Sequence, residues 1–470
     1  MPSKTASPRS QRPDGPYGPP TGGFGPAPAM PQDRPSGAPV QVAIRPRPGR
    51  LGPLRLPQLI LVETAAALVV IGLATIRIVL IPCGVAAVVL VLLALLRRNG
   101  LSPAELVRAR AALRARQRRA AAAPLDVQGD SRTDPAMAPA LECEPALRTV
   151  QHTVEFEGSS TTARRERREI GMIGDGTFLT AVIQVEAPDE PLRPARGSRP
   201  LPLDLLADGL QVDDIVVDAI QVVQYSQPSP APHLPEQALA ARGYRELPEG
   251  PSTPGLRMTW VAVRLDPELC LSAVAARGGG EVGARKSLQR AVDQLASRLV
   301  GAGLRAVVLD AGGVTAAVST ATCANPLRAG GAAAGATTAG RRTAETVRAW
   351  RCDDRWHTTY WVGQWPKLAP SSHGSGGARG GSGVGSSDLV NLLTGTPALG
   401  SAFSLTVRQA SAGAVALSGQ VRVTARGESE LEQVTRQLES RARSAGVGLV
   451  RLDHEQVPGV LATLPLGGTR

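Results

Sequence analysis

The most pronounced pattern in the chain is a nearly unbroken apolar run from Leu59 to Leu96. A single helix over this run would be roughly 57 Å long, whereas the apolar core of a bilayer is only about 30 Å thick. The run therefore predicts a hairpin of two transmembrane helices, over residues 59–76 and 78–96, with the turn near Arg77. A single tilted span is one alternative. A signal peptide is another, although the run is too long and begins too late for one.

Arginines flank both ends of the apolar run, so both termini are expected in the cytoplasm and only the turn outside. The chain is then a two-span protein of the cell membrane. Small residues on the first span would allow helices of a partner protein to approach closely. The residues predicted for this packing are Ala65, Ala66, Gly72 and Ala74.

Directly after the hairpin, residues 102–122 are predicted to form a second type of helix, rich in arginine. Ser102 fits the N-cap, Pro103 the first helical position, and Glu105 the third position after the cap. Anionic lipid headgroups are the nearest partner for such a helix, at about 1 kcal/mol for each arginine close to the surface. Contact with the membrane surface is predicted for Arg108, Arg110, Arg114, Arg116, Arg118 and Arg119.

Beyond residue 149 the hydrophobic pattern alternates between strands and helices. Strands are predicted over residues 178–185, 214–223 and 258–265, where apolar residues alternate or run continuously. The clearest amphipathic helix covers residues 281–300 and places its leucines on one face.

An internal repeat relates two parts of this region. The segment from Ala302-Gly303 to Asp310 recurs, at a constant offset, from Ala445-Gly446 to Asp453. In each copy a strand and an amphipathic helix precede the Ala-Gly turn, and a second strand ends in Leu-Asp. Two such β-α-β units predict an α/β body with partial internal symmetry.

The composition adds limits on function. The chain has 470 residues and a net charge of +12, which alone would be compatible with nucleic acid. Only 3% of its residues are aromatic, so no platform for base stacking is evident and no nucleic-acid partner is predicted. The five cysteines are scattered and lack metal-ligand spacing, which argues against both a disulfide framework and a zinc site.

Shifts in composition divide the chain into segments of different character. The predicted segments are a disordered Pro/Gly/Arg-rich cytoplasmic tail (1–50), the transmembrane hairpin (51–98), an Arg-rich juxtamembrane helix and linker (99–148), a first α/β part (149–323), a flexible loop (324–343), a Trp-rich segment (344–368), a Gly/Ser-rich linker (369–388) and a second β-α-β part (389–470).

Candidate chemistry is limited to two pairs of acids, Asp213-Asp214 and Asp353-Asp354. Converging carboxylates could hold a divalent cation beside a diphosphate, as in sugar-nucleotide transferases. A turn at a solvated strand edge explains the first pair without a metal. The histidines and cysteines show no catalytic spacing, so no catalytic, cofactor-binding or metal-binding residue is predicted. Residues 350–365 hold four of the five tryptophans, which indicates a packed nucleus or a docking face.

Taken in order, these features resemble the EccE family of the actinobacterial type VII (ESX) secretion system. The resemblance rests on the basic tail, the hairpin, the strand near Gly176, the Arg285–Leu288–Ala291 helix, the Ala-Gly-Leu turn and the Trp-rich strand, and it spans about residues 50–465. It implies an inner-membrane component beside EccB, EccC and EccD. It also implies a degenerate glycosyltransferase-like cytoplasmic domain without recognised catalytic residues. The Gly/Ser-rich insertion departs from the family.

The first hypothesis is therefore a non-enzymatic structural subunit that stabilises the inner-membrane assembly and needs no cofactor. The alternative is a membrane-anchored glycosyltransferase-like enzyme that uses the paired aspartates. A third hypothesis is a membrane-tethered regulator that binds a proline-recognition module through residues 1–50.

Overall fold

A computed structural model describes most of the chain beyond the N-terminal tail. The described residues are 42–44, 50–51, 54–74, 77–95, 103–122, 134–156, 166–188, 200–228, 237, 239, 242–243, 254–325, 341–366, 386–410 and 414–468. The predicted tail (1–50), loop (324–343) and linker (369–388) lie largely outside them.

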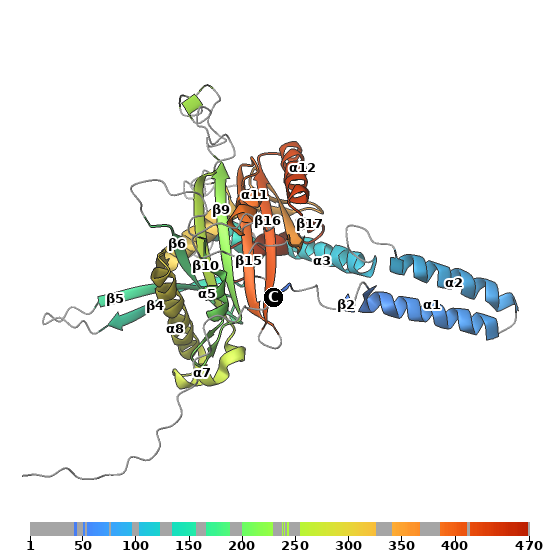
Figure 1. The fold of residues 1–470 in the computed structure, drawn as a ribbon, viewed down its shortest axis with the longest axis horizontal. Coiled ribbons are helices and arrows are strands. Elements are labelled where there is room, and N and C mark those ends of the chain that lie inside the picture. The colour runs from blue at the N-terminus through green and yellow to red at the C-terminus, as the bar shows by residue number, and fades with distance from the viewer. Residues whose placement is uncertain are drawn as a thin grey trace, which may run out of the picture. The chain divides into compact units, whose positions relative to one another are not determined.

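One large, mostly antiparallel sheet organises the described residues (Figure 1). Its main path runs β12-β13-β14-β16-β15-β9-β10-β6-β5-β4, and β1, β11 and β17 pair with β16, β6 and β14. Its strands are β1 (Val42–Ile44), β4 (Arg148–Phe156), β5 (Glu166–Gly174), β6 (Leu179–Glu186), β9 (Ala219–Pro228), β10 (Pro254–Leu265), β11 (Arg305–Val308), β12 (Thr343–Glu345), β13 (Trp350–Cys352), β14 (Arg355–Gln364), β15 (Gly400–Gln409), β16 (Val415–Ala425) and β17 (Gly448–Arg451). Two short ladders lie outside this sheet: β2 (Arg50–Leu51) with β3 (Leu54–Arg55), and β7 (Gln211–Val212) with β8 (Ile215–Val216).

Helices cover both faces of the sheet, which explains why its central strands are apolar on both sides. On one face, α8 buries Leu288, Val292 and Leu295 over the first half of the sheet, while α11 and α12 cover the second half. On the other face lie α4, α9 and the C-terminal segment. The helices after the arginine-rich region are η2 (Pro135–Met137), α4 (Ala138–Cys143), α5 (Leu203–Asp208), η3 (Pro267–Cys270), α7 (Leu271–Ala276), α8 (Gly280–Gly301), α9 (Ala311–Thr322), α11 (Ser386–Thr394), α12 (Glu428–Ser444) and α13 (Gln456–Ala462).

Two halves of the sheet carry the same elements in the same order. Apart from the β7–β8 hairpin, η3 and α7, the first half runs β5-β6-α5-β9-β10-α8-β11-α9, and the second runs β13-β14-α11-β15-β16-α12-β17-α13. The two halves meet where β9 pairs with β15. Gly303 and Gly446 follow α8 and α12 with positive φ angles of 83° and 72°, as the Ala-Gly turns predict.

The predicted α/β body, a degenerate glycosyltransferase-like fold of repeated β-α-β units, is wrong because the sheet is mostly antiparallel. In each half, the strands before and after the helix both pair with one antiparallel strand: β10 and β11 with β6, and β16 and β17 with β14. A strand-helix-strand pattern in the sequence cannot reveal that a strand from earlier in the chain, β6 or β14, lies between the two strands of the pattern.

The apolar run forms two helices, α1 (Leu56–Ala74) and α2 (Arg77–Leu95), which pack against each other. Among the described residues, however, none of the helices has the length and apolar character needed to cross a membrane. The predicted transmembrane hairpin, and with it the two-span placement in the cell membrane, is therefore wrong. Each helix has 19 residues, a rise of roughly 28 Å, and Glu63 and Arg77 shorten the uncharged stretches.

Candidate functional site

Arg116 fastens the arginine-rich helix α3 (Pro103–Ala122) to the body of the protein. Its guanidinium donates to Glu345 Oε2 at 2.8 Å, to Glu345 Oε1 at 2.9 Å and to the carbonyl oxygen of His454 at 2.6 Å. Gln117 Nε2 donates to the Glu345 carbonyl oxygen at 2.9 Å. The Glu345 carboxylate, only 5% exposed, also accepts from the backbone N–H of Val457. This one carboxylate therefore joins α3, β12 and α13.

The other arginines predicted for surface contact do not share this role. Ala109 and Leu113 form the buried side of α3, each 5% exposed. The exposed arginines of the helix are Arg108, Arg110, Arg114, Arg118 and Arg119. The helix thus has one anchoring arginine and a solvent-facing group of five.

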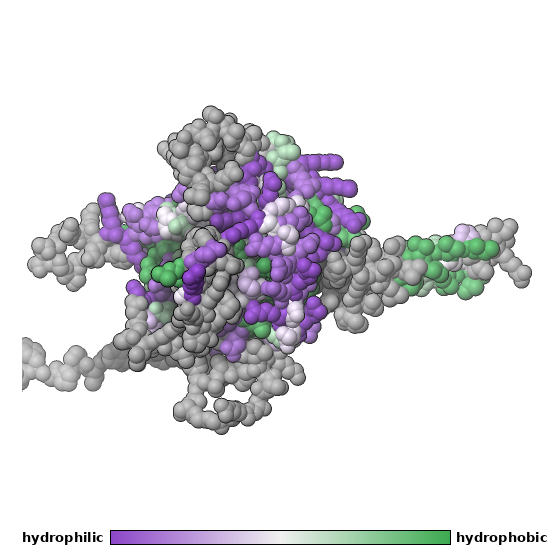
Figure 2. Space-filling model, turned by 90° about the horizontal axis from the view of Figure 1, so that it is seen from above, coloured by the Kyte–Doolittle hydropathy of each residue, from purple (hydrophilic) through white to green (hydrophobic). Residues whose placement is uncertain are grey.

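Of the small residues predicted to contact a partner helix, some are buried and others are exposed. Ala65 is 2% exposed and Gly72 is buried, whereas Ala66 and Ala74 are exposed. Figure 2 shows hydrophobic surface along the α1–α2 pair. Large side chains that are at least half exposed contribute to it: Ile60, Val70, Ile71, Leu73, Ile81, Val85 and Val88.

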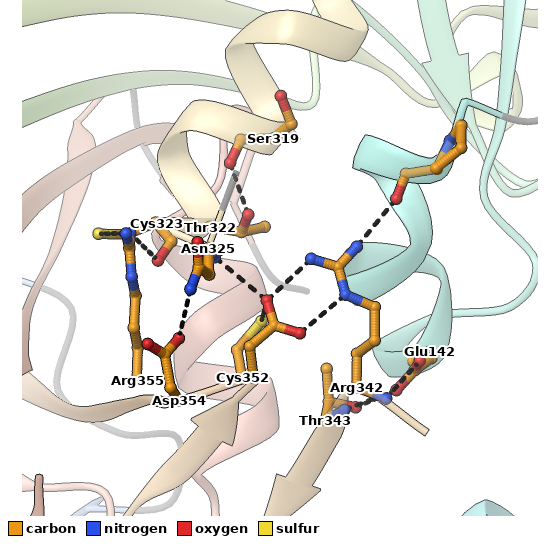
Figure 3. Close-up of polar contacts among 12 residues, drawn as sticks. Glu142, Ser319, Thr322, Cys323, Asn325, Arg342, Thr343, Cys352, Asp354 and Arg355 are labelled. Carbon is orange, nitrogen blue, oxygen red and sulfur yellow. Dashed lines mark hydrogen bonds and ion pairs between the residues drawn. The ribbon is translucent and has the colours of Figure 1, made fainter. Parts of the chain in front are cut away.

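A buried ion pair lies at the turn between β13 and β14 (Figure 3). Arg342 Nε and Nη2 donate to the two oxygens of Asp353 at 2.9 and 2.8 Å. The two side chains are 13% and 3% exposed. Hydrogen bonding to Asp353 raises the pKa of Arg342. From the other side, the backbone N–H of Asn325 donates to Asp353 at 3.1 Å, which ties the end of α9 to the same turn.

Glu142 of α4 forms the second part of this cluster. Its carboxylate accepts from the backbone N–H groups of Arg342 and Thr343 at 2.9 and 2.8 Å and from the Thr343 hydroxyl at 2.7 Å. Arg341 donates to the Glu142 carbonyl oxygen at 2.6 Å. We call Glu142, Arg342 and Asp353 the polar clamp, because together they join α4, β12, the β13–β14 turn and α9.

The paired acids occupy two separate turns and do not form one site. Asp213 and Asp353 each begin a two-residue hairpin turn with a positive φ, of 53° and 56°, a conformation that aspartate tolerates better than most residues. Asp213 pairs with Arg290 at 3.0 Å. Asp214 pairs with Arg277 at 2.6 Å, and this hydrogen bond lowers the pKa of Asp214.

Within the described ranges, no three or more His, Cys, Asp or Glu side chains come together in a group that could hold a metal ion. Burial raises the pKa of the Cys352 thiol, which keeps it protonated and weakly nucleophilic at neutral pH. The arrangement around the clamp is suited to holding elements together.

His357 is a buried neutral histidine inside the Trp-rich segment. It is 0% exposed, its Nδ1 lies 2.9 Å from the Thr424 hydroxyl, and its ring lies 4.8 Å from that of Trp350. Burial, together with the nearby Arg422 and Arg355 cations, holds the pKa of His357 well below its usual range. Trp350 is fully buried as well, so part of the tryptophan cluster is core.

This burial makes the stability of the protein depend on pH. Below about pH 6.5, the unfolded chain binds a proton at residue 357 that the folded chain does not, so stability should fall by up to about 1.4 kcal/mol per pH unit. Above that pH the residue is neutral in both states and contributes no slope. In urea unfolding at pH 7, 6 and 5, His357→Gln should remove this part of the slope. Equal slopes for wild type and His357→Gln would contradict the assignment.

Sequence reasoning missed the anchor and the clamp because their partners are distant along the chain. Arg116 and Glu345 are 229 residues apart, and Glu142 and Thr343 are 201 residues apart. No local spacing signals such a contact. The Asp-Asp pairs could have been recognised as hairpin turns, because two-residue turns favour Asp where φ is positive.

One family model matches part of the chain. Residues 253–362 match the family described as "EccE: Putative type VII ESX secretion system translocon, EccE". The matched segment begins at β10, includes α8 and α9, and contains Arg342, Glu345 and Asp353. No curated protein sequence is significantly similar to the chain.

Proposed function

We propose that this chain, whose residues 253–362 match the EccE family of the type VII ESX secretion system, is a non-catalytic subunit that stabilises the translocon assembly. One observation carries the proposal. Four charged side chains of the matched segment that have little exposure, Arg264, Arg342, Glu345 and Asp353, are engaged in contacts that join elements of this chain. Charged groups that hold elements of the chain together favour a structural role over a catalytic one.

Two surfaces are proposed for contact with the rest of the assembly. The first is the exposed apolar surface of α1 and α2, including Ala66 and Ala74, which we propose packs against helices of partner subunits. The partners proposed from the family resemblance are EccB, EccC and EccD. The second is the solvent-facing arginine group of α3, which we propose contacts anionic lipid headgroups.

The scaffold proposal is tested by affinity purification of the tagged full chain in mild detergent from its native cells, followed by mass spectrometry. Retention of EccB, EccC and EccD in one large assembly is expected. A chain that elutes alone, while those subunits remain associated with one another, would contradict the proposal.

Reversing the charge of three exposed arginines should weaken binding to anionic vesicles. Each arginine near such a surface contributes about 1 kcal/mol, so Arg114→Glu, Arg118→Glu and Arg119→Glu together should lower the affinity at least about 100-fold. Co-sedimentation with phosphatidylglycerol-containing and purely zwitterionic vesicles measures the effect. Arg116 is left intact because it anchors α3.

The matched control reverses three exposed arginines elsewhere, Arg426, Arg436 and Arg443, and so changes the net charge equally. If both triple variants lose vesicle binding to the same extent, the effect is one of net charge and α3 has no special part in it.

A further inference from the structure

A cavity of about 450 Å³ lies on one face of the sheet where the two halves meet. The helix layer of the first half is α8 and that of the second half is α12, and the strands between them are β9 and β15. Residues 200–203 and α11 line the sides of the opening above these strands. The volume is within the range of ligand pockets, about 300–1,000 Å³.

Two rows of cross-strand neighbours form the floor of the cavity. In the first row, Gln224 of β9 lies between Thr259 of β10 and Phe403 of β15. In the second row, Val222 is paired with Leu405. Phe403, Leu405 and Val222 are at most 9% exposed and form the apolar part of the floor.

Trp365 supplies an aromatic wall. A Cβ atom at Gly419 of β16 would lie 2.7 Å from two carbons of the Trp365 ring, closer than any real contact. Glycine at this position therefore lets the indole lie directly on the sheet beside the cavity. The remaining walls include Leu389 and Val390 of α11.

Three uncharged polar side chains point to the chemistry of the ligand. Gln224, Thr259 and Asn391 all line the cavity. Among the residues that the structure describes, none forms a side-chain hydrogen bond with these three groups. The charged residues at the rim are already engaged: Glu186 accepts from Gln184 at 2.6 Å, and Arg257 has a partner within the chain.

We propose that this cavity binds an uncharged peptide segment that carries a bulky apolar side chain. Amide side chains such as Gln224 and Asn391 both donate and accept, and so match the N–H and C=O groups of a peptide backbone. The aromatic and aliphatic walls fit an apolar side chain, and the rim carries one acidic and one basic side chain, Glu186 and Arg257, so its net charge does not favour an anionic ligand. This inference does not depend on the proposed function in secretion.

The test is calorimetric titration of the full-length chain with three capped dipeptides. N-acetyl-leucyl-phenylalanine amide should bind saturably at one site. N-acetyl-seryl-glycine amide, which has the same backbone without apolar side chains, should bind at least about tenfold more weakly, because little apolar area is buried. N-acetyl-leucyl-aspartate amide should also bind more weakly, because its carboxylate would lose water in a cavity that is lined mostly by apolar side chains.

Two variants locate the binding in the cavity. Gln224→Met keeps the length of the side chain and removes the amide, and it should weaken binding about five- to tenfold. Val390→Trp places a large ring at the half-buried wall of the cavity and should abolish binding. Gln433→Met, on the exposed face of α12, is the matched control and should bind as wild type does.

Circular dichroism identifies which variants are folded, and only folded variants are compared. Equal binding of the leucyl-phenylalanine and seryl-glycine probes would overturn the proposal. So would binding that survives in folded Gln224→Met and Val390→Trp, tighter binding of the aspartate probe, or the absence of binding by every probe.

Discussion

Asp353→Asn should lower the free energy of unfolding by about 3–5 kcal/mol, because it leaves the Arg342 cation without its buried counter-charge. In the wild type, Arg342 makes two hydrogen bonds to this carboxylate, and the Asp353 side chain is 3% exposed. An asparagine keeps the size of the side chain and can accept at only one atom. Urea unfolding of the full-length chain, with the slope compared between variants, measures the loss.

The neighbouring residue of the same turn provides the control. Asp354 is exposed and accepts from Asn325 Nδ2 at 3.0 Å, so Asp354→Asn should cost less than about 1 kcal/mol. Equal losses for the two variants would mean that the turn, and not the ion pair, determines stability.

Gln221→Leu should destabilise the chain by at least about 3 kcal/mol, because it leaves several buried polar groups unpaired at once. Gln221 is 0% exposed, and its Nε2 donates to Ser404 Oγ and to the Ala462 carbonyl oxygen, both at 2.8 Å. Its Oε1 accepts from the N–H groups of Gly467 and Gly468 at 2.8 and 2.9 Å. This one side chain therefore fastens the C-terminal segment to the sheet.

Two measurements separate this effect from a general loss of core packing. Gln420→Leu removes a single hydrogen bond, to Ser418, and should cost about 1 kcal/mol or less. Carboxypeptidase digestion should release the C-terminal residues faster from Gln221→Leu than from Gln420→Leu. Equal stability losses and equal digestion rates would contradict the anchoring role of Gln221.

Local patterns in the sequence were sufficient for several individual elements. The stripe of Leu288, Val292 and Leu295 predicted α8, and Ser102-Pro103 predicted the start of α3. The Ala-Gly turns at Gly303 and Gly446 are also confirmed. Such signals succeed because helix periodicity, capping and positive φ depend on residues within one or two turns of each other.

The hydropathy of the run at 59–96 was a weaker guide. It located α1 and α2 to within a few residues, yet it did not establish a membrane span. The strand expected over residues 214–223 is instead a short hairpin arm, β8, followed by β9. A bend at Asp218 separates β8 from β9, and continuous apolarity alone does not mark such a break.

By itself, then, the sequence predicted α1, α2, α3, α8 and α12, several strands of the sheet, the repeated order of elements and the resemblance to EccE. Only the tertiary structure decided that β6 and β14 insert between the strands of each repeat, that Glu345 holds Arg116, and that Gln221 holds the C-terminal segment. The physical reason is that these contacts join residues far apart in the sequence. Strand pairing, buried ion pairs and a cavity between two helix layers join residues up to hundreds of positions apart, and they depend on which surfaces pack together.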